Sequence, residues 1–283
     1  IKVSIIISSS VKKVKMNSPD IYDSSQKIPI LIQEVRELYR YQYLLTQLIR
    51  RDILTRYKRS FLGIAWTMLN PLGTMVVMTI VFSNLFGTTQ DYPVYVLSGL
   101  LAWNFFSKST LAAMKSMLWG GDLLKKIYLP RSSFCLSAIG TEIVNLILSL
   151  VPMALVMLVT GFKFHLSMSF LPLSILTISL FALGIALLLS TFSVVFPDVA
   201  EMYEIILVAW MYLTPIIYPA SMFPERYKYF LTLNPMTYFI ELFHIPLYQG
   251  RFPTWMEFWP ALVIGLSVLV IGWLFFSKKI DEF

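Results

Sequence analysis

Hydrophobic residues are grouped along this chain in long runs that contain no charged side chain. The uncharged runs cover 31 positions at 60–90, 16 at 92–107, 32 at 166–197, and 20 each at 205–224 and 258–277. Another run, 132–160, is interrupted only by Glu142. A helix needs about 20 mostly apolar residues to cross a bilayer. The pattern predicts an all-α membrane protein with six transmembrane helices within 60–283, the second extended to residue 114 with Lys108 near an interface.

Composition and charge narrow the class of protein. Hydrophobic residues make up 57% of the chain and charged residues 14%, and the mean hydropathy is +0.70. Soluble domains carry about 25% charged residues, so the composition disfavours a water-soluble enzyme. The net charge of +7 comes from basic clusters beside the hydrophobic runs, which does not indicate nucleic-acid binding. The single cysteine, Cys135, excludes a disulfide framework and a cysteine-based metal site.

The basic residues beside the runs predict the orientation, because cytoplasmic flanks retain Lys and Arg. With the amino terminus inside, eleven flank the cytoplasmic ends: Arg50, Arg51, Arg56, Lys58, Arg59, Lys115, Lys125, Lys126, Arg131, Lys278 and Lys279. Only Lys163, Arg226, Lys228 and Arg251 flank the outer ends. The chain is therefore predicted to be a multi-pass protein of the inner (cytoplasmic) membrane with both termini in the cytoplasm.

The residues before the first run divide into two parts. Residues 1–29 are predicted to be a flexible leader, and 30–59 an amphipathic helix on the cytoplasmic membrane surface. In that helix Val35, Leu38, Tyr41, Leu45, Leu48 and Ile49 share an arc of about 140° opposite Arg36, Arg40 and Arg51. The alternative is a solvated linker helix.

A short cytoplasmic helix is predicted in the connection at 120–131. Gly120 and Gly121 break the preceding helix, Asp122 can cap a new one, and Pro130 ends it. Its candidate docking residues are Asp122, Leu123, Leu124, Lys125, Lys126, Ile127, Tyr128 and Arg131. The apolar members are unusual for a free loop and predict a docking surface. The alternative is a loop without function.

The outer segment at 219–256 is too long for a hairpin and contains several prolines. Asn234 and Pro235 are typical of an N-cap and a first helical residue, followed by an apolar helix at 236–245. An apolar helix outside the spans is expected to re-enter the membrane. Because re-entrant backbone is tolerated only beside protein or a watery cavity, this segment is predicted to cap or line a passage.

Little in the sequence predicts catalysis by the chain itself. There is no G-x-x-x-x-G-K-[ST] motif for nucleotide and no H-E-x-x-H motif for metal. His165 and His244 belong to different outer loops and are interpreted as interfacial residues. Glu142 lies inside a predicted span, where a charge costs about 2.5–3.5 kcal/mol. A role of Glu142 in gating or in pairing with Lys108 is as well supported as a position of Glu142 near the inner membrane interface without such a role.

Aromatic residues within or at the ends of the spans are candidates for lining a passage. These candidates are Trp66, Trp103, Phe106, Tyr203, Trp210 and Tyr212. An aromatic passage suits sugars, whose C–H faces stack on rings without fixed charge. The alternative is a belt of aromatic residues at the membrane interfaces.

Several stretches resemble the permeases of type-2 ABC exporters, in particular those that export O-antigen and related cell-surface polysaccharides. The resemblance rests on 51–66 (RDILTRYKRSFLGIAW) with 69–72 (LNPL), 214–218 (TPIIY), 233–238 (LNPMTY) and 248–250 (YQG), in this order and spacing. It covers roughly residues 30–283. One departure is Pro197 in 196–199 (FPDV), where the family commonly has arginine, so the role of that loop is transferred only loosely.

The resemblance implies a homodimer of six-span subunits that binds two cytoplasmic ATPase subunits. The helix at 120–131, with Asp198 and Glu201, would contact the ATPase, which would hold ATP and magnesium, so this chain binds no cofactor. The implied cargo is a lipid-diphosphate-linked polysaccharide. Arg51, Arg56, Lys58 and Arg59 would attract its diphosphate, although topology alone explains them equally well.

Other functions remain open beside this one. A teichoic-acid exporter would differ only in cargo. A drug or lipid exporter on the same scaffold would have less need of an aromatic passage. A membrane-embedded lipid-modifying enzyme would act without an ATPase, with Glu142 as acid or base.

Overall fold

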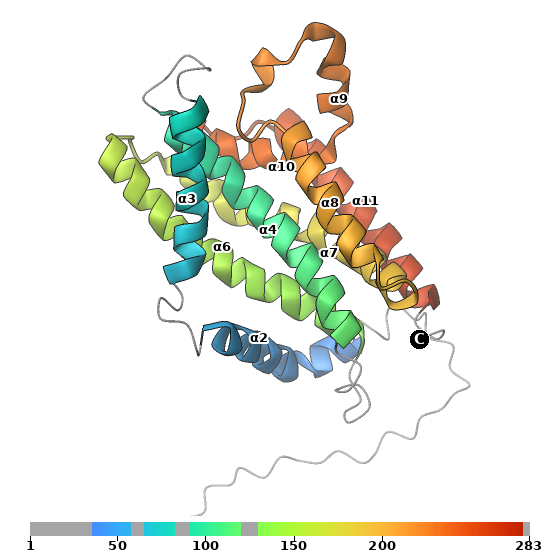
Figure 1. Ribbon diagram of the computed structural model, residues 1–283. Coiled ribbons are helices and arrows are strands. Elements are labelled where there is room, and N and C mark those ends of the chain that lie inside the picture. Colours follow the sequence, from blue (N-terminus) through green and yellow to red (C-terminus); the bar gives the residue numbers. More distant parts are fainter. Residues whose placement is uncertain (1–35, 58–64, 83–90, 120–129, 280–283) are drawn as a thin grey trace, which may run out of the picture.

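The computed structural model describes residues 36–57, 65–82, 91–119 and 130–279, and every regular element in these ranges is helical (Figure 1). The long helices are α2 (Gln42–Tyr57), α3 (Ala65–Phe82), α4 (Tyr92–Trp119), α6 (Ser132–Thr160), α7 (Leu171–Val195), α8 (Val199–Leu213) and α11 (Trp255–Lys279). Shorter elements are η1 (Leu166–Phe170), η2 (Ala220–Met222), η3 (Glu225–Tyr227), α9 (Lys228–Leu233), α10 (Pro235–His244) and the π-helical η4 (Ile245–Gln249). The predicted all-α class is confirmed for this part of the chain.

Three described helices have the length and apolar composition needed to cross a membrane: Ser132–Thr160, Leu166–Val195 and Trp255–Lys279. They coincide with the third, fourth and sixth predicted spans. The chain is therefore a multi-pass membrane protein, while the count of six spans stays a prediction. A shorter apolar helix, Leu69–Phe82, falls in the first predicted run, and α4 continues to Trp119, beyond the predicted end of the second.

Helix α8 differs most from its predicted span at 205–224. It begins earlier and ends at Leu213, because Pro215 lacks an amide N–H and disfavours helical backbone at Thr214. Its 15 residues extend about 22 Å, less than the roughly 30 Å of a bilayer core. The outer segment therefore begins within the depth that this span was expected to fill.

Helix α4 lies at the centre of the bundle and packs against α3, α6, α7, α8 and α10. Its fully buried side chains include Leu97, Phe106 and Met114. Helix α11 packs along α7, where glycines bring the two backbones together. A Cβ atom added at Gly184 would lie 2.6 Å from backbone atoms of Val268 and Leu269. Small residues permit this close approach between membrane helices.

Helix α2 lies across one end of the bundle and packs against α6 (Figure 1). Leu48 is buried, and Ile49 packs against Gly140 of α6. Arg36, Arg40 and Arg51 are exposed, as the predicted helical arc requires. A helical stretch at 36–40 precedes α2, while residues 1–35 lie outside the described part. Contact of this helix with lipid stays a prediction.

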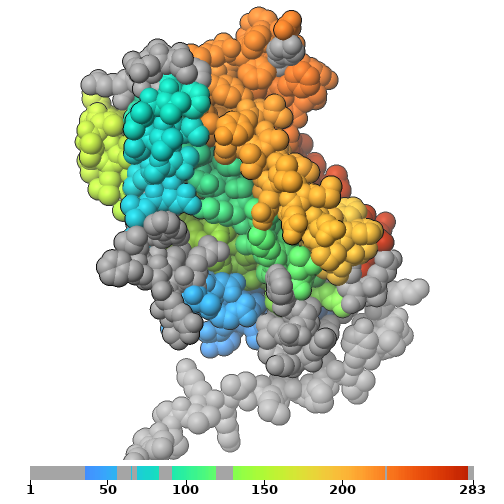
Figure 2. Space-filling view, viewed as in Figure 1, coloured from blue at the N-terminus to red at the C-terminus, as the bar shows by residue number. Residues whose placement is uncertain are grey.

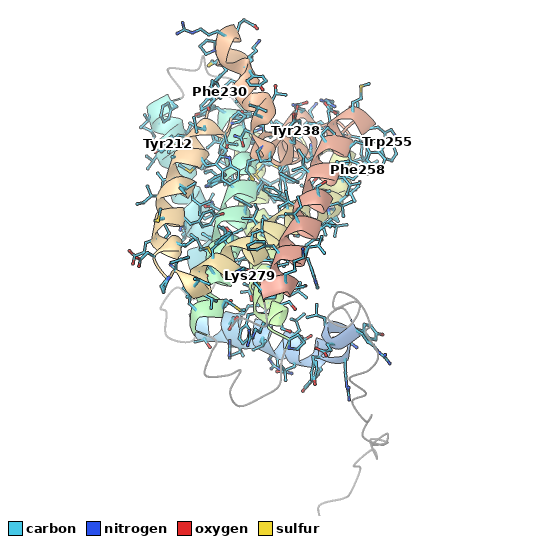
Figure 3. The ribbon with its side chains drawn as sticks, turned by 90° about the vertical axis from the view of Figure 1, so that its right-hand side faces the viewer. Tyr212, Phe230, Tyr238, Trp255, Phe258 and Lys279 are labelled. Atoms are coloured by element: carbon cyan, nitrogen blue, oxygen red, sulfur yellow. The ribbon has the colours of Figure 1, made fainter. Side chains whose placement is uncertain are left out.

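Side chains from several helices mark the two ends of the bundle. Tyr212, Tyr238, Trp255 and Phe258 lie near the end opposite α2, whereas Lys279 lies near α2 (Figure 3). Helix α10 crosses the end opposite α2, and the segment from η2 to α9 extends beyond it (Figure 1). We refer to the two ends as the α2 end and the α10 end.

Candidate functional site

A continuous aromatic stack crosses the subunit beneath the α10 end. The ring of Trp210 in α8 makes edge contacts with Trp103 and Phe106 of α4, with centroid separations of 6.1 and 5.4 Å. Phe106 stacks on Phe181 of α7 at 5.3 Å, and Phe181 stacks on Phe239 of α10 at 4.7 Å. The aromatic stack therefore links four helices, α4, α7, α8 and α10.

The stack changes the interpretation of the aromatic residues proposed to line a passage. Trp103, Phe106 and Tyr203 are enclosed by their own subunit, and the Tyr203 hydroxyl lies 3.1 Å from Thr110 Oγ1. Within the subunit these three side chains therefore lie in the core, and their place along a passage stays a prediction. Trp210 is half-buried and Tyr212 is 55% exposed, while the side chain of Trp66 lies outside the described part.

The Asn234 side chain joins the end of α8 to the beginning of α10. Its Oδ1 accepts hydrogen bonds from the Met236 amide at 3.1 Å and from Trp210 Nε1 at 2.7 Å. Its Nδ2 donates to Thr214 Oγ1 at 2.9 Å and to the Leu213 carbonyl at 3.3 Å. The predicted N-cap is confirmed. The bond to Trp210 was not predicted, because the two residues are 24 positions apart and belong to different helices.

The carboxyl end of α10 is buried against α4. The His244 ring lies 4.2 Å from the ring of Tyr95, and its Nε2 faces Gly99, where an added Cβ would come within 2.8 Å. Burial lowers the pKa of His244 to about 3, so the imidazole is neutral. The interpretation of His244 as interfacial is wrong, because Gly99 has no side chain and leaves room for the ring in the core.

Tyrosine side chains attach this region to the chain that follows α8. The Tyr95 hydroxyl lies within hydrogen-bond distance of the carbonyls of Pro215 and Tyr218, at 3.1 and 3.0 Å. The Tyr92 hydroxyl donates to the Ile217 carbonyl at 2.8 Å. The Tyr248 ring packs edge-on against Tyr95. Segments 214–218 and 248–250, singled out by their sequence, therefore meet at the start of α4.

An ionic cluster lies beside α10 at the α10 end of the bundle. Arg251 Nη1 donates to Glu257 Oε2 at 2.8 Å, and the Thr254 amide donates to the same oxygen at 2.7 Å. Burial raises the pKa of the Glu241 carboxyl, Glu257 raises it further, and Arg251 opposes both. No three His, Cys, Asp or Glu side chains in the described ranges are grouped so that they could hold a metal ion.

A polar pocket lies between α3, α4 and α6, within the predicted spans. It is lined by Pro71, Leu101, Asn104, Phe105, Lys108, Glu142, Asn145, Leu146 and Ser149, and its empty volume is about 360 Å³ including the mouth. Glu142 is 2% exposed and accepts a hydrogen bond from Asn145 Nδ2 at 3.0 Å. Glu142 and Lys108 therefore line one pocket. Helix α4 continues past Lys108 to Trp119, and the predicted position of Lys108 near a membrane interface stays a prediction.

The predicted cytoplasmic contact residues lie at the α2 end as far as the structure describes them. Asp198 and Glu201 are exposed at the start of α8, and Arg131 directly precedes α6. A nearby ion pair between Lys115 and Glu204, at 2.6 Å, joins α4 to α8. The predicted docking residues Asp122, Leu123, Leu124, Lys125, Lys126, Ile127 and Tyr128 lie outside the described residues.

Only part of the predicted basic entry site is described. Arg51 is exposed at the α2 end and pairs with Asp52 at 2.9 Å, which offsets part of its charge. The side chain of Arg56 is not among those described, and Lys58 and Arg59 lie outside the described residues. The grouping of these four residues into an entry site therefore stays a prediction.

Comparison with known proteins assigns the architecture to a family. The family model of the ABC-2 type transporters matches residues 43–248. The O-antigen export system permease protein RfbA of Myxococcus xanthus is 29% identical over 259 residues, 89% of this chain and 98% of the relative. RfbA of Klebsiella pneumoniae is 27% identical over 83% of this chain and 91% of its own length. The polysialic acid transport protein KpsM of Escherichia coli is 23% identical over 80% and 89%. The chain therefore belongs to the ABC-2 type transporter family.

Proposed function

We propose that this chain is the membrane-spanning permease subunit of an ATP-driven exporter of lipid-diphosphate-linked cell-surface polysaccharide, with O-antigen as the best-supported cargo. The observation that carries the proposal is the near full-length similarity to relatives named as O-antigen export permeases. The sequence has no nucleotide-binding loop of the G-x-x-x-x-G-K-[ST] type. ATP and magnesium would therefore be bound and used by a separate ATPase subunit, and this chain would catalyse no reaction itself.

The α2 end is proposed to face the cytoplasm, with six spans and both termini inside. This end carries basic residues from several helices: Arg51 in α2, Lys115 in the last turns of α4, Arg131 before α6 and Lys279 at the end of α11. Cytoplasmic flanks retain basic residues during insertion, which supports the assignment. Helix α2 would then rest on the inner leaflet, with its exposed arginines attracted to anionic lipid.

The ATPase would bind at the α2 end. The end of α4, the beginning of α6 and the exposed start of α8 all lie at this end. Asp198 and Glu201 have the exposure that a partner contact requires. Contact at the start of α8 would let the ATPase act on a helix that reaches towards the outer segment.

A second copy of the chain would complete the passage. Helices α3 and α8 lie on one face of the subunit with part of α4 between them (Figure 2). Their exposed apolar side chains include Val77 and Ile80 of α3 and Ile205 and Val208 of α8. Tyr212 extends from the same helix, α8, and is the described candidate best placed for a passage on that face. Pairing of two such faces would enclose a passage between the copies.

The cargo would be handed over at the inner leaflet. Arg51, Arg56, Lys58 and Arg59 provide a cationic stretch for the diphosphate at the start of the first predicted span. Changing all four to glutamine should lower export while the protein still inserts. Loss or inversion of the inserted protein would instead assign these residues to topology. Lys278→Gln with Lys279→Gln is the matched control at the same end.

The proposal is tested by co-purifying the chain with its candidate ATPase and reconstituting the complex in proteoliposomes. We expect ATP-dependent movement of a lipid-diphosphate-linked glycan, and none with either subunit alone. Preference for a teichoic-acid precursor would identify the alternative exporter, and movement of unglycosylated lipid or drug would identify a lipid or drug exporter. Conversion of a lipid by the isolated chain would indicate a membrane enzyme and overturn the proposal.

A further inference from the structure

The two ends of α10 are attached to different parts of the subunit. At its carboxyl end, Ser174 Oγ of α7 donates to the Leu242 carbonyl at 2.8 Å, and Ser167 Oγ of η1 donates to the Pro246 carbonyl at 3.1 Å. His244 is buried against Gly99 of α4. This end of α10 is therefore fixed to the central bundle.

The amino end of α10 is attached to α8 through Asn234. The Asn234 oxygen accepts two hydrogen bonds and its NH2 group donates two, so the whole amide is used. Two of the partners, Trp210 and Leu213, are in α8, and a third, Thr214, directly follows it. A shift of the end of α8 therefore acts on the first turn of α10 through short, directional bonds.

Helix α8 is held to the bundle along a narrow stripe. Only Ala200, Tyr203 and Leu207 are buried among its residues, and most of its other large side chains are exposed. Its most extensive contacts in the described part of the chain are with α4 and α7. The exposed start of α8, at Asp198 and Glu201, is at the α2 end. Helix α8 thus connects the end where the ATPase is proposed to act with the outer segment.

We propose that Asn234 is a positioning residue that transmits movement of α8 to α10, with the end of α10 near His244 as the pivot. The inference rests on the proposed function, because the movement of α8 is driven by the ATPase. Displacement of the amino end of α10 would open or close the outer mouth of the passage. Trp210 serves the same link, since its indole donates to Asn234 while its ring rests on the aromatic stack.

Two conservative variants separate this role from folding. Asn234→Asp keeps an oxygen acceptor for Met236 and Trp210 and removes the donors to Leu213 and Thr214. Trp210→Phe keeps an aromatic ring and removes the indole donor. Trp255→Phe is the matched control, because the Trp255 side chain is 72% exposed on α11 near the same end of the molecule.

The experiment uses the complete permease–ATPase complex in proteoliposomes. Spin labels at Leu233→Cys and Met256→Cys, both exposed, report the distance from the start of α10 to α11 with and without ATP. We expect a nucleotide-dependent change in that distance, reduced by at least half in Asn234→Asp and Trp210→Phe. Export per ATP hydrolysed should fall about three- to tenfold, the effect of losing one hydrogen bond. Trp255→Phe should match the parent.

The outcomes separate the inference from the proposed function. Parental distance changes and parental export per ATP in both variants would overturn the coupling role, as would a parent complex whose labels never move. A fall in membrane abundance in proportion to the loss of export, or a fall in melting temperature large enough to account for that loss, would assign Asn234 to folding. Either result would also overturn the coupling role. Failure of the parent to export any glycan would reject the proposed function, while the label distances would still test the link.

Discussion

Replacing glycine by alanine where α7 packs against α11 should destabilise the protein more than the small size of the added methyl group suggests. A Cβ at Gly184 would lie 2.6 Å from the carbonyl group of Val268, whereas ordinary contact begins at 3.4 Å, so the helices must separate by about 0.8 Å. A Cβ at Gly272 would meet the backbone of Gly184 even more closely. These obstacles are backbone atoms, which cannot rotate away as a side chain does. We therefore expect each change to cost about 3 kcal/mol, the upper part of the range for overpacking.

The matched control is Gly73→Ala in α3, where nothing lies within 4 Å of the added atom. Alanine there should stabilise the helix by about 0.5–1 kcal/mol, because glycine loses more backbone entropy on folding. Thermal unfolding in detergent should show Gly184→Ala and Gly272→Ala melting on the order of 5–10 °C below the parent. The double variant should cost less than the sum, since one separation relieves both contacts.

The result that refutes this reasoning is a Gly184→Ala protein that melts within about 2 °C of Gly73→Ala. Such a result would mean that the two backbones are not in contact in the folded protein. Chain abundance in the membrane is measured in parallel, so that a defect in insertion is not counted as a loss of stability.

Three further predictions concern other regions of the subunit. Gly140→Ala should be tolerated because the Ile49 side chain can turn away, whereas Gly140→Leu should release α2 and increase hydrogen exchange at residues 42–57. Lys115→Met should change the unfolding free energy by less than about 1 kcal/mol, because both partners in its ion pair with Glu204 are about half exposed. Glu241→Gln should raise the melting temperature at pH 8, because burial raises the pKa of Glu241 above 4.5 and ionisation costs stability as pH rises through the raised value. The gain should vanish below pH 4.5, where the parent residue is also protonated; a gain that persists there would contradict the assignment.

Local chemistry explains which features could be predicted from sequence. The run at 132–160 is both long and apolar, and it forms α6 with the same bounds. Asn234 before Pro235 predicted an N-cap because both preferences act within one turn of backbone. The end of α8 was misplaced, although Pro215 carried the information, because absence of charge shows how far a chain is apolar and not where its helix stops.

Features that depend on contacts between helices could not be predicted in the same way. Trp103 and Phe106 are aromatic, and aromatic residues are expected both along a passage and in a core. Only their contacts with Trp210 and Phe181 assign them to the core. The burial of His244 could not be predicted for the same reason, because the space beside Gly99 arises from the packing of α10 on α4. Faces of helices in a membrane protein are hard to assign from sequence, since lipid and core are both apolar.

Three of the stretches that carry the family resemblance, 214–218, 233–238 and 248–250, meet at one joint of the structure. Segments 214–218 and 233–238 are connected by the bond between Thr214 and Asn234, and Tyr95 contacts both Pro215 and Tyr248. These contacts fix how α8, α10 and the start of α4 are arranged. They do not form an exposed surface that could bind a sugar. These three stretches therefore determine how the segment that follows α8 is attached to α8 and α4. We therefore expect selection between polysaccharides to depend on exposed positions such as Tyr212. Exchange of the exposed residues of α8 between two related permeases should transfer cargo preference without altering the joint.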